Sequence, residues 1–414
     1  MNTIFVQIAS FRDPELNPTI KNLLQNAKYP ENLRFGICNQ YNPEDNFNID
    51  EFRDDTRFRT LDVLDVVSLG ACWARHSLQQ LYSGETYTLQ IDSHMRFIEN
   101  WDEEVISILE NLKKSGVKKP LLTGYVSSYD PENDPNGRVQ EPWEQVFDRF
   151  IPEGTIFTLP QVIPNWKKLT EPIQTRFYSA HFCFVDGSFV KEVPHDPNLY
   201  FHSEEMSIAV RAWTNGYDLY HPHKIICWHE YSRFGRNKHW DIDKEWYKKN
   251  DKSHKRNRQL FGMDGEEKKD FGIYGFGTER TLRDYEKYSG ILFEKRAVQQ
   301  YTIDKKYPPN PYNFNNDDEW KNSFLRIFKH CIDLSFDLVK ETDYDFWVVA
   351  FHNEKDETLF RQDAQPDEIN RMMKDKDGYC KIWREFNTTE KPKYWVVWPH
   401  STSKGWCDRI TGNL

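Results

Sequence analysis

The sequence predicts an α/β protein with a parallel sheet in its first part and a smaller β-rich part at its end. In the first part, strand-like and helical patterns alternate: Thr3–Ile8 is a strand, Asn17-Pro18 opens a helix to about Ala27, and Leu33–Asn39 is a second strand. Short strand–helix–strand connections of this kind are typical of a parallel sheet. Near the C-terminus, apolar aromatic runs are followed by polar turns, which is typical of a β-rich module.

The elements between these two regions continue the alternation. We expect helices at Leu69–Leu81, at Asp102–Ser115, from the N-cap Ser203 through about Trp213, and from Thr278 onward. We expect further strands at Phe58–Val63, Tyr87–Ile91, Pro120–Gly124, Arg176–Val185, Tyr217–Tyr220 and Lys224–Trp228.

A boundary is predicted near Pro308-Pro309-Asn310-Pro311, where the chain changes character. We expect residues 1–300 to form one domain and residues 310–414 to form a small β-rich accessory module. Two segments of this module resemble each other, Phe346–His352 and Tyr394–His400. Their apolar aromatic pattern predicts that they are paired strands.

The tryptophans of the module allow two interpretations. They offer either a glycan-binding surface or ordinary core packing, and we favour core packing for Trp383, Trp398 and Trp406.

Composition narrows the classes of function. The net charge of −10 argues against a general nucleic-acid binder. Seven scattered cysteines without a CxxC pair predict a reducing compartment and no disulfide framework. The chain starts directly in a strand and contains no apolar stretch long enough to span a membrane, so we expect a soluble, cytoplasmic protein. An aromatic content of 15% fits either sugar handling or large cores.

A metal site is predicted where the strand Tyr87–Ile91 ends in Asp92-Ser93-His94. Asp92 and His94 lie two residues apart and can therefore face the same way. A carboxylate and an imidazole so placed suit a divalent cation. His229 follows another apolar strand and is a third candidate ligand, although a structural role for it is also open. A metal held here would carry a nucleotide diphosphate.

Groups around this motif are candidates for the nucleotide and for catalysis. Arg75 and Arg233 can share the charge of a diphosphate, and Tyr231 lies beside Arg233. The small residues from Gly70 onward let a ligand come close, or simply pack on the sheet. Glu204 and Glu205 begin a helix, where acids are favoured by the helix dipole. They are candidates for catalysis, or ordinary acids of a first turn.

A basic segment, Arg236 to Arg258, is unusual in an acidic chain. It is dense in Lys, Arg and Trp and poor in aliphatic residues. It can meet an anionic donor or acceptor, or it can be the solvated face of a helix.

Five motifs in order carry a resemblance to a known family. The chain resembles the GlcNAc-transferase family typified by the Skp1 hydroxyproline GlcNAc-transferase, which is distantly similar to the polypeptide GalNAc-transferases. The motifs span roughly Asn2 to Phe293 and are Ile8-Ala9-Ser10-Phe11-Arg12-Asp13-Pro14-Glu15, Gly70-Ala71-Cys72-Trp73-Ala74-Arg75, Leu89-Gln90-Ile91-Asp92-Ser93-His94-Met95-Arg96-Phe97, Phe201-His202-Ser203-Glu204-Glu205 and Gly277-Thr278-Glu279-Arg280-Thr281.

The resemblance implies a GT-A fold with a mixed, mostly parallel sheet. It implies a UDP-sugar donor, most readily UDP-GlcNAc, with a divalent cation, usually Mn²⁺, and transfer with retention to a hydroxyl of a protein or glycan acceptor. It assigns the metal to Asp92, His94 and His229. It places Ser10 and Arg12 on the loop that meets the nucleotide and Arg75 on the helix beside it, and it places the acids Glu204 and Glu205 near the donor sugar and acceptor. Together with these three, we expect Gly70, Ser93, Tyr231 and Arg233 to bind the cofactor.

Several alternatives stay open at this stage. The same ligands suit a metal-dependent phosphoester hydrolase, although that chemistry usually needs two metals and more clustered carboxylates. A transferase for another UDP-hexose in surface polysaccharide synthesis and a non-catalytic glycan-binding protein are also possible. Retention is compatible with a double displacement through a carboxylate or with a front-face reaction in which the leaving phosphate takes the acceptor proton. The acceptor and the oligomeric state have no readable code.

Overall fold

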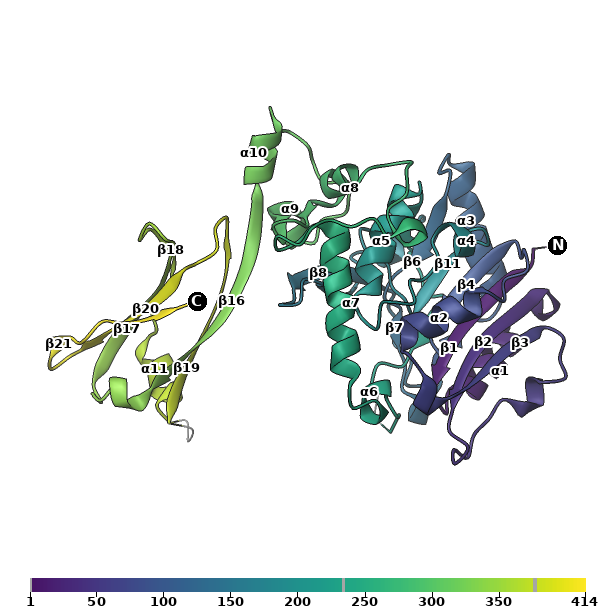
Figure 1. Cartoon of the computed structure of the whole chain (residues 1–414), viewed down its shortest axis with the longest axis horizontal. Helices are drawn as coiled ribbons and strands as arrows, with labels where there is room; N and C mark the ends of the chain where they lie inside the picture. Colours follow the sequence, from purple (N-terminus) through teal and green to yellow (C-terminus); the bar gives the residue numbers. More distant parts are fainter. Residues whose placement is uncertain (1, 233–234, 375–377) are drawn as a thin grey trace. The chain divides into compact units, whose positions relative to one another are not determined.

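The structure, a computed structural model, describes residues 2–232, 235–374 and 378–414 and has the predicted α/β fold class (Figure 1). The chain divides into two compact units. Unit 1 comprises Met1–Glu294 and Tyr301–Pro311, and unit 2 comprises Lys295–Gln300 and Tyr312–Leu414.

An eight-stranded sheet forms the centre of unit 1, with the strand order β10-β12-β6-β11-β4-β1-β2-β3. Six of these strands run in one direction, because β1 is parallel to β2 and β4, β2 is parallel to β3, and β12 is parallel to β6. Only β11 and β10 run against their neighbours, so the sheet is mixed and mostly parallel. The strands are β1 (Ile4–Phe11), β2 (Leu33–Tyr41), β3 (Phe58–Leu64), β4 (Tyr87–Ile91), β6 (Pro120–Thr123), β10 (Ile173–Gln174), β11 (Phe182–Asp186) and β12 (Asp218–His221).

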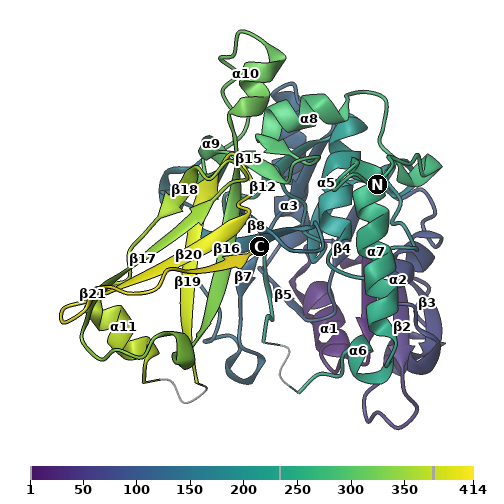
Figure 2. The ribbon, with the colours of Figure 1, turned by 60° about the vertical axis from the view of Figure 1, so that its left-hand side comes forward.

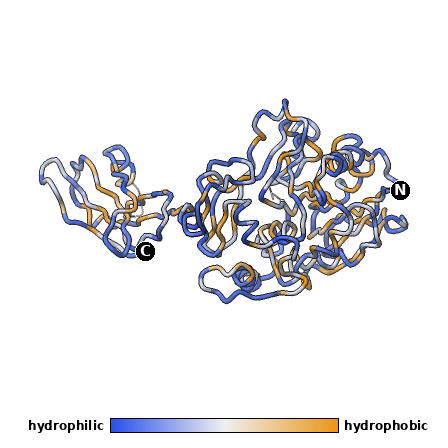
Figure 3. Tube along the Cα trace, turned by 90° about the horizontal axis from the view of Figure 1, so that it is seen from above, coloured by the Kyte–Doolittle hydropathy of each residue, from blue (hydrophilic) through white to orange (hydrophobic). Residues whose placement is uncertain are grey.

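The central strands are apolar because both of their faces are covered. Every residue of β4 is buried, and Ile4–Ile8 of β1 is buried as well. Continuous apolar runs of this kind are typical of parallel strands between two layers of helices. The hydropathy colouring of the chain trace shows hydrophobic, orange segments in the interior of unit 1 (Figure 3).

Helices follow the strands as the alternating pattern predicts. Between residues 16 and 289, unit 1 contains the helices α1 (Leu16–Asn26), α2 (Ala71–Gln79), α3 (Trp101–Lys114), α4 (Phe189–Glu192), α5 (Glu204–Thr214), α6 (His239–Ile242), α7 (Trp246–Phe261) and α8 (Leu282–Ser289). The basic segment forms α6 and α7, and the long α7 helix is prominent when the molecule is turned (Figure 2). The short elements β14 (Ile291–Leu292) and α9 (Gln300–Ile303) come next along the chain.

Two small sheets complete unit 1. One has the order β5-β13-β7, with β5 (Met95–Phe97), β7 (Ser127–Ser128) and β13 (Cys227–His229). Its antiparallel β5–β13 register sets His229 opposite Met95. The other is a hairpin of β8 (Trp143–Phe150) and β9 (Ile156–Val162).

Unit 2 is rich in β-structure, as predicted for this part of the chain. β16 (Phe324–Ser335) pairs with β19 (Tyr379–Thr388) and with β15 (Ala297–Gln299). A second sheet pairs β17 (Tyr344–His352) with β18 (Thr358–Arg361) and β20 (Tyr394–Ser401), and β20 with β21 (Gly405–Trp406) and β22 (Ile410–Asn413). The helices are α10 (Asp317–Asn322) and α11 (Pro366–Met372). The predicted pairing of the two similar segments is confirmed, since Phe346 faces His400 and His352 faces Tyr394.

Several local predictions are wrong. The strand predicted at Arg176–Val185 forms only over Phe182–Asp186. Ser203, by contrast, is the N-cap residue of α5 as predicted, although its hydroxyl bonds that of Ser253 at 2.5 Å and makes no capping hydrogen bond. The helix predicted from Thr278 starts at Leu282, where Thr281 and Asp284 form a capping box.

Core packing of the tryptophans is also wrong for two of the three. The Trp383 side chain is 58% exposed and that of Trp406 is 50% exposed. The free cysteines of β2, α2, β11 and β13 are buried, as expected. Among the described residues, no helix is both long and apolar enough to cross a membrane.

Candidate active site

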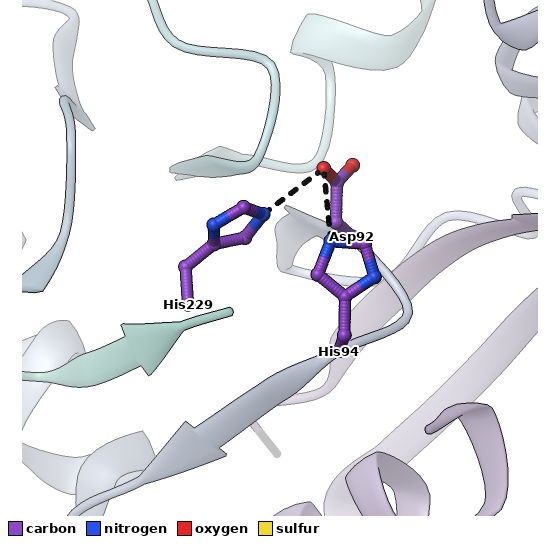
Figure 4. Close-up of side chains that lie close together, drawn as sticks. All are labelled: Asp92, His94 and His229. Carbon is purple, nitrogen blue, oxygen red and sulfur yellow. Dashed lines mark hydrogen bonds and ion pairs between the residues drawn. The ribbon is translucent and has the colours of Figure 1, made fainter. Parts of the chain in front are cut away.

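Three side chains meet at the carboxyl end of β4. Asp92 follows β4, His94 precedes β5, and His229 ends β13, whose pairing with β5 brings it to the same place. Nε2 of His229 lies 3.3 Å from Oδ2 of Asp92, and Nε2 of His94 lies 3.9 Å from the same oxygen (Figure 4). The three possible ligand atoms all lie within 4.8 Å of one another.

The orientation of His94 is fixed by a carboxylate on its far side. Nδ1 of His94 lies 2.7 Å from Oδ2 of Asp13, and the Ser93 hydroxyl donates to the same oxygen at 2.8 Å. Burial alone would raise the pKa of Asp13, but the hydrogen bond from His94 and the charges of His94 and Arg236 hold it well below its usual range. Ionised Asp13 therefore accepts a hydrogen bond from Nδ1 of His94, which leaves Nε2 on the side of the ring that faces Asp92.

Asp92 is held ionised by its surroundings. Burial would raise its pKa, but the hydrogen bond from His229 and the positive charge of Arg75 bring the pKa well below its usual value. Nη2 of Arg75 donates to Oδ1 of Asp92 at 2.9 Å, and Nη1 donates to Oε1 of Glu204 at 3.0 Å. Oδ2 of Asp92 is left to face the histidines.

His229 is neutral near pH 7. Burial lowers its pKa to about 4, although the hydrogen bond to Asp92 opposes this change. Its ring packs among three others, with centroid distances of 4.6 Å to His94, 4.5 Å to His181 and 4.3 Å to Tyr231. A neutral imidazole is the form that binds a metal.

These donors fit one divalent cation. One carboxylate oxygen and two imidazole nitrogens suit Mn²⁺, Fe²⁺, Co²⁺ or Zn²⁺ better than Ca²⁺, which prefers an all-oxygen shell. The Asp13–His94 bond is the outer carboxylate–histidine contact that supports metal-binding histidines. Three protein ligands leave coordination positions for oxygens of a bound molecule.

A cavity of about 250 Å³ opens beside the three candidate ligands. It lies at the carboxyl ends of β1 and β4, where the chain order of the sheet reverses direction, which is the usual ligand position in an open α/β sheet. Its walls come from β1 and the loop after it, from the start of α2, and from the segment after β13. The lining includes Ala9, Phe11, Asp13, Gln40, Ser68, Gly70, Ala71, Arg75, Tyr200, Phe201, Glu230, Tyr231, Arg236, Asn237, Lys238, His239 and Trp240.

The start of α2 suits an anionic ligand. The first amides of a helix are unpaired and its dipole is positive there. Gly70 has a φ of +106°, and a Cβ at this position would lie 2.7 Å from the Tyr200 ring. Glycine therefore allows both the backbone turn and the close approach of Tyr200 to the helix start.

The first part of the basic segment forms one wall of the cavity. Nη1 of Arg236 lies 3.3 Å from Oδ2 of Asp13, and Nη2 lies 2.5 Å from Glu230. His239 bridges two other walls, with Nδ1 2.8 Å from the Tyr200 hydroxyl and Nε2 3.0 Å from the Ser68 carbonyl oxygen. The first part of the basic segment thus brings positive charge to the cavity and is held in place at Arg236 and at His239.

The predicted site residues fall into four groups. The three metal candidates line the cavity, together with Gly70, Arg75, Ser93 and Tyr231. Ser10 and Arg12 do not, because side chains alternate along β1 and the loop after it, and Phe11 and Asp13 face the cavity instead. Arg12 is turned to Asp45 and Asp65, at 2.6 and 3.2 Å. Arg233 lies outside the described residues. Glu204 is buried at the start of α5 and Glu205 beside it is partly exposed, and neither lines the cavity.

The two glutamates have different partners. Glu204 is 3% exposed and holds Arg75, as described above. Oε1 of Glu205 accepts from the backbone N–H of Ala180 at 2.8 Å. Burial and the neighbouring Glu204 charge raise the pKa of Glu205 to about 8, so its carboxyl is protonated near pH 7. Their role in catalysis stays a prediction.

Sequence reasoning missed several residues at the cavity. Asp13 is the most important, and it lies inside a motif that the sequence had already marked. Its position five residues after the expected strand end at Ile8 gives no sign that it reaches His94. Tyr200 and His239 gave no signal, because their contact joins residues 39 apart in sequence.

Comparison with known proteins identifies the family. The family model described as Glycosyltransferase (GlcNAc) matches residues 3–55 and 47–295. A search of curated proteins found no match. Among solved structures, GalNAc-T7 with UDP, GalNAc and Mn²⁺ is 12% identical with a TM-score of 0.51, and the alignment covers 100% of this chain and 79% of that one. TarS residues 1–349 of S. aureus with UDP-GlcNAc is 11% identical with a TM-score of 0.38, over 63% of this chain and 67% of that one, which is too weak a likeness to carry an argument.

The family match covers more than half of the chain, and the fold agrees with it. A mixed, mostly parallel sheet carries a ligand cavity at its carboxyl edge, as in GT-A glycosyltransferases. The chain belongs to the Glycosyltransferase (GlcNAc) family and has a GT-A fold.

Proposed function

We propose that the protein is a metal-dependent, retaining transferase that moves GlcNAc from UDP-GlcNAc to a hydroxyl of a protein or glycan acceptor. The observation that carries this proposal is the meeting of Asp92, His94 and His229 at the mouth of the cavity beside α2. The family name supports GlcNAc, and the GalNAc-T7 structure, which contains UDP and Mn²⁺, supports this pairing of nucleotide and metal.

The proposed metal ion and the neighbouring arginines would neutralise the negative charge of a leaving diphosphate. A divalent cation at Asp92, His94 and His229 supplies Lewis-acid neutralisation of a leaving diphosphate. Arg75 fixes the Asp92 carboxylate, and Arg236 brings a further positive charge to the same cavity. The amides at the start of α2 favour the same anion.

Retention is proposed to proceed on one face of the sugar. Glu204 already holds Arg75, and Glu205 is protonated near pH 7 and so is a poor base and nucleophile. A front-face reaction needs neither as a base, because the leaving phosphate oxygen takes the acceptor proton as the new glycosidic bond forms. Glu204 then serves the reaction by positioning Arg75, and Glu205 is suited to donate a hydrogen bond.

The first experiment measures the thermal shift given by UDP, UMP or ADP, each with Mn²⁺ or with EDTA. UDP with Mn²⁺ is expected to stabilise the protein most, because ligand binding to the native state raises its stability. Asp92→Asn should remove the Mn²⁺-dependent part of the shift. If UDP with Mn²⁺ gives no shift in a folded protein, the proposed donor class is wrong.

A matched control uses Asp186, which pairs with Tyr87 at the start of β4, whereas Asp92 follows the end of the same strand. Its side chain is 31% exposed, against 27% for Asp92, and it too has a basic partner, Lys113 at 2.6 Å. Asp186→Asn should keep the full shift. Release of UDP from UDP-GlcNAc and from UDP-GalNAc then tests the donor sugar, and equal rates would overturn GlcNAc as the preferred donor.

Acceptor transfer separates this proposal from the hydrolase alternative. A transferase should convert UDP-GlcNAc to UDP faster when a peptide or oligosaccharide hydroxyl is supplied, with the sugar recovered on that acceptor in the α-configuration. UDP release that no acceptor accelerates, with free GlcNAc as the product, would favour hydrolysis.

A further inference from the structure

We propose that unit 2 binds carbohydrate on an aromatic platform formed by Phe346, Trp398, His400 and Trp406. The family match ends at residue 295 and leaves the role of this unit open. The platform lies on β17, β20 and β21, which are neighbouring strands of one sheet (Figures 1 and 2). The choice of a sugar as ligand rests in part on the proposed function.

Strand register brings the four rings together. Phe346 lies opposite His400, and His400 lies opposite Trp406, so one row crosses three strands. Trp398 is two residues before His400 and therefore shares its face. The other face of the sheet is turned into the core, where Trp347, Val349 and Val397 are fully buried.

The rings support one another in defined positions. Phe346 stacks on His400 with centroids 5.2 Å apart and planes 11° apart, and Trp406 meets His400 edge-on at 4.9 Å. Trp398 lies 4.4 Å from Trp406, and its indole N–H donates to the Cys407 carbonyl oxygen at 2.9 Å. The Trp406 side chain remains 50% exposed although it is anchored on one side. A pre-positioned and open indole costs little side-chain entropy when it binds a ligand.

A β-bulge adds a carboxylate to this face. The pairing of β17 with β20 shifts between Tyr344 and Phe346, which makes Asp345 the extra residue. Without the bulge, Asp345 would point away from the Phe346 face, because side chains alternate along a strand. Instead, its two carboxylate oxygens lie 2.7 and 2.9 Å from Nδ1 of His400, and its side chain is 41% exposed.

Open aromatic faces beside hydrogen-bond acceptors suit a pyranose ring. The C–H groups of a sugar pack on the electron-rich face of an indole, and sugar hydroxyls donate to carboxylate oxygens. Asp345 accepts the Nδ1 proton of His400 and still has lone pairs for a ligand hydroxyl. The chemistry favours a sugar with equatorial hydroxyls, such as a β-linked glucose or N-acetylglucosamine residue, because its ring faces carry only C–H groups.

Trp383 supplies a matched control on the other sheet of unit 2. It is 58% exposed on β19, where exposed and buried residues alternate strictly. Its neighbour across the strands is Cys331, and the next exposed residue along β19 is Glu385, which pairs with Lys329. An exposed indole is present here, but the row of rings and the bulge carboxylate are not part of this strand pair.

The experiment measures binding of the full chain to tetra-N-acetylchitotetraose, cellotetraose and β-1,4-galactotetraose by calorimetry, in EDTA and without nucleotide. We expect binding of the first two and weaker binding of the galactose oligomer, which has axial hydroxyls. Trp406→Ala should weaken binding by about tenfold or more, and Asp345→Asn, which keeps the side-chain shape, should weaken it by several-fold. Trp383→Ala should leave it unchanged.

Each contrary result overturns the proposal. The proposal is wrong if the folded wild-type chain binds no oligosaccharide or if Trp406→Ala still binds it as tightly as wild type. It is also wrong if Trp383→Ala loses as much oligosaccharide affinity as Trp406→Ala. A wild-type dimer that Trp406→Ala converts to a monomer, with no oligosaccharide bound, would identify the platform as a contact between copies instead. Asp92→Asn should retain oligosaccharide binding, so a failure of the proposed donor site and a failure of the platform are distinguishable.

Discussion

The Nδ1 atom of His94 lies 2.7 Å from Oδ2 of Asp13, so Asp13, which is outside the candidate metal triad, sets the orientation of the candidate ligand His94. Asp13→Asn removes the charge that keeps the proton on Nδ1 of His94. We expect Mn²⁺ to bind about 10- to 100-fold more weakly, which is the usual cost of losing such an outer contact. Titration of Mn²⁺ followed by electron paramagnetic resonance measures this directly.

Asp65→Asn is the control for this substitution. Asp65 is as buried as Asp13 and also pairs with an arginine, Arg12 at 3.2 Å, but it touches none of the metal candidates. Its substitution should leave Mn²⁺ affinity unchanged. Equal weakening by both substitutions would show a general loss of structure and would remove the special role of Asp13.

The bridge from Glu204 through Arg75 to Asp92 predicts a large stability effect. Glu204→Gln leaves the buried Arg75 guanidinium with half of its charge compensation gone. We expect the free energy of unfolding to fall by about 3 kcal/mol, because a buried charge is left partly unpaired. Urea unfolding of Glu204→Gln, Arg75→Met and the double variant gives the coupling energy. Additive effects would contradict a direct pair.

Glu205 predicts how stability depends on pH. Its pKa is raised from 4.5 to about 8 by burial and by the Glu204 charge, so the folded state holds a proton that the unfolded state releases. The free energy of unfolding should therefore fall as the pH rises from about 4.5 to about 8, by at most about 1.4 kcal/mol per pH unit from this group.

Glu205→Gln should remove this contribution, because the amide cannot titrate and its oxygen can still accept from the Ala180 N–H. Urea unfolding in EDTA at several pH values between 5 and 8 gives the two slopes. If wild type and variant lose stability equally with rising pH, Glu205 is ionised in the folded state.

Gly70 predicts a steric effect on nucleotide binding. Gly70→Ala places a methyl group 2.7 Å from the Tyr200 ring and forces a side chain into a backbone conformation with φ +106°. Displacement of Tyr200 breaks its hydrogen bond with His239 in the cavity wall. We expect weaker UDP binding in the presence of Mn²⁺, together with a loss of stability of about 1–3 kcal/mol.

Gly84→Ala separates the two causes. Gly84 has a similar φ of +95°, but a Cβ there meets nothing within 4 Å. It should cost backbone strain alone and leave UDP affinity unchanged. Loss of UDP binding in both variants would mean that strain, and not the Tyr200 contact, is responsible.

The sequence predicted those features that depend on local patterns. The buried runs at β1, β2 and β4 are visible as strands because a parallel sheet covered on both faces needs continuous apolar segments. Asp92 and His94 were recognised because they follow such a run at a spacing of two. His229 joins them through the β5–β13 register, which a local pattern cannot show.

Other features depended on side-chain direction and long-range contacts. Ser10 and Arg12 lie on the expected loop, but the alternation of side chains turns Phe11 and Asp13 to the cavity. Trp406 was expected in a core because tryptophan is usually buried. The hairpin of β20 and β21 instead places it on an outer row, beside a carboxylate turned by a bulge that no sequence pattern revealed.

The pairing of Met95 with His229 also constrains the order of events during synthesis. The third candidate ligand is made 134 residues after the strand partner that positions it (229 − 95). A ribosome that has made β1 to β5 has made only Asp92 and His94 of the three candidate ligands, so the nascent chain lacks a complete metal site until β13 emerges. Closing so long a loop is slow, because its entropy must be lost before the contact forms. Metal capture is therefore expected as a late step of folding in unit 1.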